Sequence, residues 1–135
     1  MTPVFLDGGY VIALEASDDE NHPAAARQWR NLRRRLPPLA TPTLVFAEIV
    51  TSFNTRRRHA KAVEVGNLLL ETPGVTLVTA DEIVIAARLG IFATTRRQIF
   101  SLADCVSFVV MRERGISKAL SFDRHFVQAG FEKLP

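Results

Sequence analysis

Four carboxylates occupy positions that ordinary packing does not readily explain: Asp7, Glu48, Asp104 and Asp123. Asp7 ends the apolar run Val-Phe-Leu, and Asp123 ends the run Ala-Leu-Ser-Phe. A buried carboxylate without a partner is strongly unfavourable. Each of these acids must therefore be exposed, be paired or bind a cation, and a group of such acids is the usual oxygen-rich site for a divalent metal.

Helix capping is a competing explanation for three of the four acids. Asp7 and Asp123 each stand between a predicted strand and a predicted helix, where an aspartate commonly accepts hydrogen bonds from the first-turn amides. Asp104 follows Ser101 at the spacing of a capping box. Taken singly, these aspartates fit the role of a cap better than the role of a catalyst.

Glu48 has no such explanation, because it lies inside the apolar segment Leu-Val-Phe-Ala-Glu-Ile-Val of a predicted helix. No lysine or arginine lies within one helical turn of it. If Glu48 points inward, a distant arginine or a metal must supply the compensating charge. An outward position on the surface is the alternative.

The elements that must position these acids alternate along the chain. Short β-rich segments are predicted at residues 3–6, 39–41, 75–78, 119–122 and 131–134. Helical patterns are predicted at residues 9–16, 23–36, 43–56, 59–71, 81–93, 102–114 and 124–129. Strands alternating with helices of this length favour right-handed crossovers and a parallel sheet covered on both faces. We expect a three-layer α/β/α sandwich formed by one domain, residues 1–135.

A central parallel sheet of order 3-2-1-4-5 would bring the acids together. In this order the chain leaves the first strand in one direction and later returns on its other side, which opens a crevice at the carboxyl ends of strands one and four. Asp7 and Asp123 lie at that crevice. The helices that carry Glu48 and Asp104 begin near it, so they can bring these two acids over the same site. Mg²⁺, with Mn²⁺ as the other candidate, matches a site rich in carboxylates.

Composition and charge narrow the class of protein. The chain has 135 residues, a net charge of +3, a pI near 9.6 and one cysteine. No apolar stretch is close to the length of about 20 residues that a helix needs to span a bilayer. No secretory signal is evident. We therefore expect a cytoplasmic protein without a membrane partner.

The arginines occur in clusters. If the clusters converge in the fold, they favour phosphate recognition; if they do not, they are better explained as solvated residues at helix ends. The candidate RNA contacts are Arg33, Arg34, Arg35, Arg56, Arg57, Arg58 and Arg124. The three histidines are too scattered for a zinc motif. His125, two residues after Asp123, is expected at an exposed first-turn position or beside a phosphate.

Taken together, the sequence resembles the PIN-domain ribonucleases, and especially the VapC-type toxins of toxin-antitoxin pairs. The resemblance rests on Asp7 after the first strand, Glu48 in its apolar helix, Asp104 in SLADCVSFVVM and Asp123 in FDRHF followed by GF. It covers nearly the whole chain.

The resemblance implies a metal-dependent endoribonuclease that acts on RNA as a homodimer and is held by a cognate antitoxin. All four acids would then hold one or two Mg²⁺ ions, directly or through water, and the products would carry 5′-phosphate and 3′-hydroxyl ends.

The chain departs from this family at Gly8 and Gly9, because members usually carry Thr or Ser after the first aspartate. One interpretation is that the glycines leave space for substrate. The other is that they mark the loss of a hydroxyl that oriented Asp7, so that Gly8→Thr would increase cleavage; we slightly favour this one. A related alternative for the whole protein is a weakly active or non-catalytic PIN-like module that binds RNA or another protein.

Overall fold

The structure, a computed structural model, describes residues 1–79, 81, 89 and 100–135. Its centre is a five-stranded sheet of order β3-β2-β1-β4-β5 in which every pair of neighbours is parallel. The predicted strand order is therefore confirmed. The strands are β1 (Val4–Leu6), β2 (Leu39–Pro42), β3 (Val75–Val78), β4 (Lys118–Leu120) and β5 (Glu132–Leu134).

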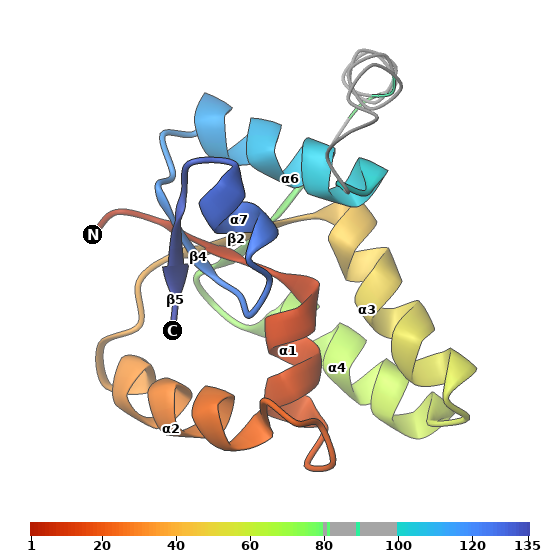
Figure 1. The fold of residues 1–135 in the computed structure, drawn as a ribbon. Coiled ribbons are helices and arrows are strands. Elements are labelled where there is room, and N and C mark those ends of the chain that lie inside the picture. The colour runs from red at the N-terminus through yellow and green to blue at the C-terminus, as the bar shows by residue number, and fades with distance from the viewer. Residues whose placement is uncertain (80, 82–88, 90–99) are drawn as a thin grey trace.

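Helices cover both faces of the sheet (Figure 1). Successive residues of a strand point to opposite faces, and β1 shows both: Val4 and Leu6 join one apolar cluster, whereas Phe5 joins the other. The first cluster includes side chains of α1 (Gly8–Glu15), α2 (His22–Leu32), α3 (Thr43–Thr55) and α4 (His59–Glu71); the second includes those of α6 (Leu102–Glu113) and α7 (His125–Gln128). The sandwich expected from the sequence is thus confirmed.

The second helix is shorter than predicted. A single helix was expected over residues 23–36, but α2 ends at Leu32 and a 3₁₀ turn, η1 (Arg33–Arg35), follows it. Leu36 is extended, with φ −71° and ψ 124°, because the residue before a proline avoids the helical region. The helix expected at residues 81–93 lies outside the described residues, apart from its positions 81 and 89.

In the described part of the chain, no helix is both long enough and apolar enough to cross a membrane.

The first turn of α1 lies unusually close to α3. A Cβ atom at Gly8 would lie 3.3 Å from Ile49 Cγ1 and 3.4 Å from Val45 Cγ1. Both neighbours are β-branched and buried, so they have little freedom to move away. A Cβ at Gly9 would meet only Asp7 Oδ2, at 3.8 Å. The packing therefore explains the glycine at position 8 by the approach of α3, and it gives no support to the hypothesis that a threonine would fit there. That the glycines leave space for substrate stays a prediction.

Alanine substitutions at the two glycines should have opposite effects. Gly8→Ala should lower the free energy of unfolding, because overpacking costs about 1–3 kcal/mol and exceeds the gain in helix propensity of up to about 1 kcal/mol. Gly9→Ala is the matched control: it should raise the free energy of unfolding, because it gains the same helix propensity without overpacking. Urea denaturation of both variants measures the difference. Equal stabilities would show that α3 does not require a glycine at position 8.

Candidate active site

The first aspartate of the site is tied to the neighbouring strand by a serine. The parallel register pairs Leu6 of β1 with Leu120 of β4. The residues that follow these two strands, Asp7 and Ser121, therefore leave the sheet side by side. The Ser121 hydroxyl donates to Asp7 Oδ2 over 2.7 Å and accepts from the backbone N–H of Asp123 over 3.0 Å. Ser121 is fully buried. One hydroxyl thus positions both strand-end aspartates.

Asp7 also caps α1, because its Oδ1 accepts from the N–H of Gly8 over 2.9 Å. Both of its oxygens are therefore held by donors, one from its own helix and one from Ser121. This fixes the direction in which the carboxylate can present its remaining lone pairs.

The third aspartate comes from the start of α6. Ser101 accepts from the N–H of Asp104 over 3.0 Å, and Asp104 Oδ2 accepts from the N–H of Ser101 over 3.1 Å. This is the capping box expected from the sequence, and it leaves Asp104 Oδ1 with no hydrogen-bond partner among the described residues.

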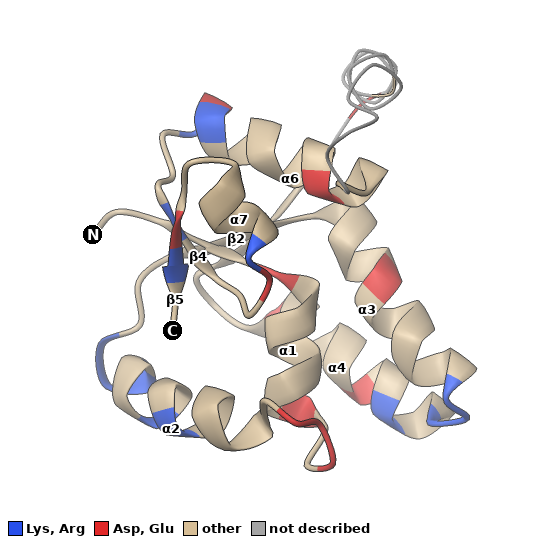
Figure 2. Cartoon of the chain, viewed as in Figure 1, with Lys and Arg blue, Asp and Glu red and all other residues tan. Residues whose placement is uncertain are grey.

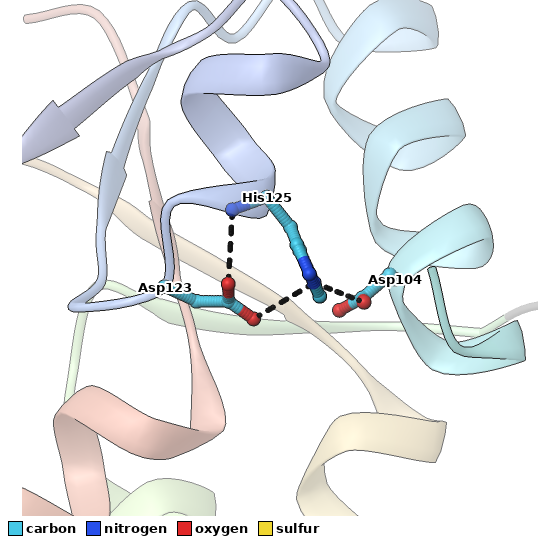
Figure 3. Close-up of side chains that lie close together, drawn as sticks. All are labelled: Asp104, Asp123 and His125. Atoms are coloured by element: carbon cyan, nitrogen blue, oxygen red, sulfur yellow. Dashed lines mark hydrogen bonds and ion pairs between the residues drawn. The ribbon is translucent and has the colours of Figure 1, made fainter. Parts of the chain in front are cut away.

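His125 joins the two later aspartates (Figure 3). Its Nδ1 lies 3.1 Å from Asp104 Oδ2 and 3.3 Å from Asp123 Oδ2, and its backbone N–H donates to Asp123 Oδ1 over 2.9 Å. Only 26% of the His125 side chain is exposed. The expectation of an exposed first-turn histidine was therefore wrong, because α7 packs against α6 through the apolar cluster that contains Phe126 and Phe108.

A cleft of about 240 Å³ opens over the acids. Asp7, Glu48 and Asp104 line it, together with the two glycines of α1. Glu48 is solvent-exposed as a residue and points to the cleft rather than to the core. It therefore needs no buried cation of the kind that an inward glutamate would need.

Burial and like charge both disfavour ionised carboxylates in this cleft. The pKa of Asp7 is raised to about 6, first by desolvation and then by the charges of Asp123 and Asp104, while hydrogen bonds from Ser121 and Gly8 act in the opposite direction. The pKa of Glu48 is also raised, first by desolvation and then by Asp104. Among the described residues, no lysine or arginine forms an ion pair with any of the four acids. The cluster is therefore short of positive charge.

Capping and convergence turn out to be compatible. Each of the three aspartates accepts a backbone hydrogen bond at a helix start, and each also lies at the common site. The structure brings together all four acids that the sequence singled out. It adds two residues that sequence reasoning missed or misplaced, Ser121 and His125. The sequence feature that could have pointed to them is their distance from Asp123: Ser121 lies two residues before it and His125 two residues after it.

The ribbon segments that carry the arginine clusters lie apart from the starts of α1 and α6, which carry two of the acids (Figure 2). Arg33–Arg35 precede β2, so they lie at the edge where the strands begin, whereas the acids lie where β1 and β4 end. The arginines at positions 56–58 follow the end of α3, and Arg56 is about 12 Å along the helix axis from Glu48 at 1.5 Å per residue. Arg124 alone of the seven is adjacent to a site residue, Asp123, and it is exposed.

The fold and the acidic cleft define a class, and the chain belongs to the PIN-domain family: the model of that family matches residues 4–132. Two curated relatives from Mycobacterium tuberculosis, strains CDC 1551 / Oshkosh and ATCC 25618 / H37Rv, are both named 23S rRNA-specific endonuclease VapC20. Each is 34% identical over 129 residues, which is 95% of this chain and 95% of the relative. The crystal structure of Mycobacterium tuberculosis VapC20, described as a sarcin-ricin loop cleaving toxin, matches with a TM-score of 0.84 at 28% identity and covers 95% of both chains.

Removal of the Asp7 charge should stabilise the metal-free protein. The folded-state pKa of about 6 lies above the ordinary value of 3.8, so the folded protein binds this proton more tightly than the unfolded chain does. As the pH rises from 3.8 to about 6, ionisation of Asp7 therefore lowers the free energy of unfolding. Above pH 6 this unfavourable effect remains constant. At about 1.4 kcal/mol per pKa unit, Asp7→Asn should raise the free energy of unfolding by about 2–3 kcal/mol at pH 7.5.

The measurement is denaturant unfolding of both proteins in chelator between pH 4 and pH 8. The gap between Asp7→Asn and the parent should be small at the acidic end and full above pH 6. Asp18→Asn is the control, because the Asp18 side chain is 83% exposed and lies 3.7 Å from Arg58. A gap that did not vary with pH would contradict the raised pKa.

Loss of the Ser121 hydroxyl should raise the pKa of Asp7 further, because the variant lacks a donor that favours the ionised form. Ser121→Ala should also lower the free energy of unfolding by about 1–3 kcal/mol, since the N–H of Asp123 loses its acceptor. Carbon-13 NMR of the Asp7 carboxyl follows the titration. Ser107→Ala is the matched control, because the buried Ser107 hydroxyl donates only to Ala103 O within its own helix. An unchanged Asp7 titration in Ser121→Ala would reject this role.

Proposed function

We propose that this protein is a divalent-metal-dependent endoribonuclease that hydrolyses RNA phosphodiester bonds as the toxin of a toxin-antitoxin pair. The observation that carries the proposal is that Asp7, Glu48 and Asp104 line one cleft, with Asp123 close enough to act on Asp7, and that no lysine or arginine among the described residues pairs with them. Membership of the PIN family and the endonuclease names of the relatives support it.

The donor set fits a hard divalent cation. Carboxylate oxygens suit Mg²⁺ and Mn²⁺, and the raised pKa of Asp7 marks a site where negative charge lacks compensation. We propose that Mg²⁺ or Mn²⁺ would be held by Asp7, Asp104 and Asp123, with Glu48 completing the site through water. Such an ion lowers the pKa of bound water and offsets charge on the scissile phosphate.

We propose Glu48 as the general base. Asp7, Asp104 and Asp123 each accept at least one hydrogen bond, whereas Glu48 has no hydrogen-bond partner among the described residues and lines the cleft. Its raised pKa brings it closer to the pKa that suits a proton acceptor near neutral pH. The water oxygen would form a bond to phosphorus as the bond from phosphorus to the 3′-oxygen breaks. Glu48 would take the proton of that water, and a proton from solvent would go to the departing 3′-oxygen. The products would carry 5′-phosphate and 3′-hydroxyl ends.

RNA is the proposed substrate class, and by similarity to VapC20 a loop of ribosomal RNA is the first target to test. Arg124 is the basic residue proposed to contact a phosphate beside the site, since it precedes α7 next to Asp123. We propose that the arginines at positions 33–35 and 56–58 contact RNA well away from the scissile bond. The net charge of +3 supports attraction to RNA in general.

An antitoxin and a second copy of the chain are the proposed protein partners. Exposed apolar side chains on α4 support a protein contact, since Val63, Leu68 and Leu70 are 49%, 45% and 60% exposed. No specific observation favours the non-catalytic alternative. The hydroxyl whose absence at position 8 motivated it is not needed to hold Asp7, because Ser121 donates to that carboxylate.

The decisive assay is cleavage of total RNA and of ribosomal RNA in Mg²⁺ or Mn²⁺. Asp7→Asn, Glu48→Gln, Asp104→Asn and Asp123→Asn should each lower the rate by about a hundredfold or more. Asp18→Asn should cleave like the parent, because Asp18 lies outside the cleft. Each variant's fold is checked by its thermal transition. Cleavage that survives Asp7→Asn, or a parent protein that cleaves no RNA with either ion, would contradict the proposal.

A further inference from the structure

His125 presents a nitrogen to the candidate metal site in a fixed orientation. Its ring packs edge-on against Phe100, with centroids 5.3 Å apart and planes at 72°, and Phe100 packs in turn against Phe108 at 5.1 Å. The backbone N–H of His125 is held by Asp123. The Nδ1 edge of the ring therefore points between the carboxylates of Asp104 and Asp123 (Figure 3).

The spacing of the three donor atoms suits one small cation. Neighbouring ligands of an octahedral ion with bonds of 2.0–2.1 Å are about 3.0 Å apart. The observed separations of Nδ1 from the two carboxylate oxygens are 3.1 and 3.3 Å, and ligand atoms of Asp104, Asp123 and His125 all lie within 4.8 Å of one another. Small side-chain rotations would bring all three to one ion.

We propose that His125 Nδ1 ligates the divalent cation together with Asp104 and Asp123, and that this nitrogen gives the protein a preference for Mn²⁺ over Mg²⁺. The inference rests on the proposed function, because it adds a ligand to that metal site. Carboxylates alone discriminate weakly between these two hard ions, whereas an imidazole nitrogen suits transition metals and is a poor ligand for Mg²⁺.

The competing role for His125 is that of a hydrogen-bond clamp that only orients the two aspartates. His125→Asn separates the two roles, because the asparagine amide can still donate to the carboxylates but carries no nitrogen lone pair for a metal. His59→Asn is the matched control, since His59 is exposed and its Nδ1 contacts Asn54 in the described structure.

Calorimetric titration with Mn²⁺ and with Mg²⁺ compares the three proteins. His125→Asn should weaken Mn²⁺ binding by about tenfold or more, while Mg²⁺ binding changes much less. His59→Asn should match the parent for both ions. Equal losses for both ions in His125→Asn would assign the clamp role, and unchanged binding of both would remove His125 from the site; either result overturns the inference.

Electron spin-echo spectroscopy of bound Mn²⁺ detects a directly coordinated imidazole nitrogen. The signal should be present in the parent and absent in His125→Asn. The chain has three histidines, so if His125→Asn does not fold, the double variant His22→Asn/His59→Asn assigns the nitrogen by elimination. Absence of a nitrogen signal in the parent, or its loss in that double variant, would refute ligation by His125.

Cleavage assays on the same samples keep the two proposals distinguishable. Metal-dependent cleavage without nitrogen coordination would leave the ribonuclease proposal intact and overturn the role of His125. Nitrogen coordination in a protein that cleaves no RNA would support the ligand assignment and remove the proposed activity.

Discussion

The hydrogen bond from Ser121 to Asp7 is the interaction on which the geometry of the site depends. It joins the ends of β1 and β4, the two strands between which the crevice opens. The same hydroxyl accepts from the N–H of Asp123, so one buried side chain fixes two acids from distant parts of the sequence. Because Asp123 in turn holds the start of α7, the position of His125, and through it the link to Asp104, depends on the same contact.

This arrangement places stability and function in opposition. Three aspartates are oriented by caps and by Ser121. Burial raises the pKa of Asp7, and the charges of the other two aspartates, held close to it, raise that pKa further. A fold selected for stability alone would avoid such a group. Among the described residues, the only basic side chain that contacts these aspartates is His125, which is cationic only when protonated. A divalent cation would offset the repulsion, so metal binding and stability should be coupled.

The sequence was sufficient to predict the strand order, and it singled out four acids that the fold places near one another, because alternating elements and strand-end carboxylates are visible as local patterns. The roles of Ser121, His125 and Gly8 depend on contacts between distant segments. Ser121 acts through the register of β1 against β4, His125 through the packing of α7 on α6, and Gly8 through the approach of α3. The arginines illustrate the same limit: their clustering is visible in the sequence, but the separation of the clusters at positions 33–35 and 56–58 from the acids follows from the topology.

The central claim is that the Asp7 carboxylate lacks compensating charge until a cation binds. Carbon-13 NMR titration of that carboxyl, in chelator and again in saturating Mg²⁺, tests the claim most directly. The account predicts a pKa of about 6 in chelator and a clearly lower pKa in Mg²⁺, because a nearby cation favours the ionised form. A pKa near 3.8 in chelator, or a titration that Mg²⁺ does not change, would contradict it.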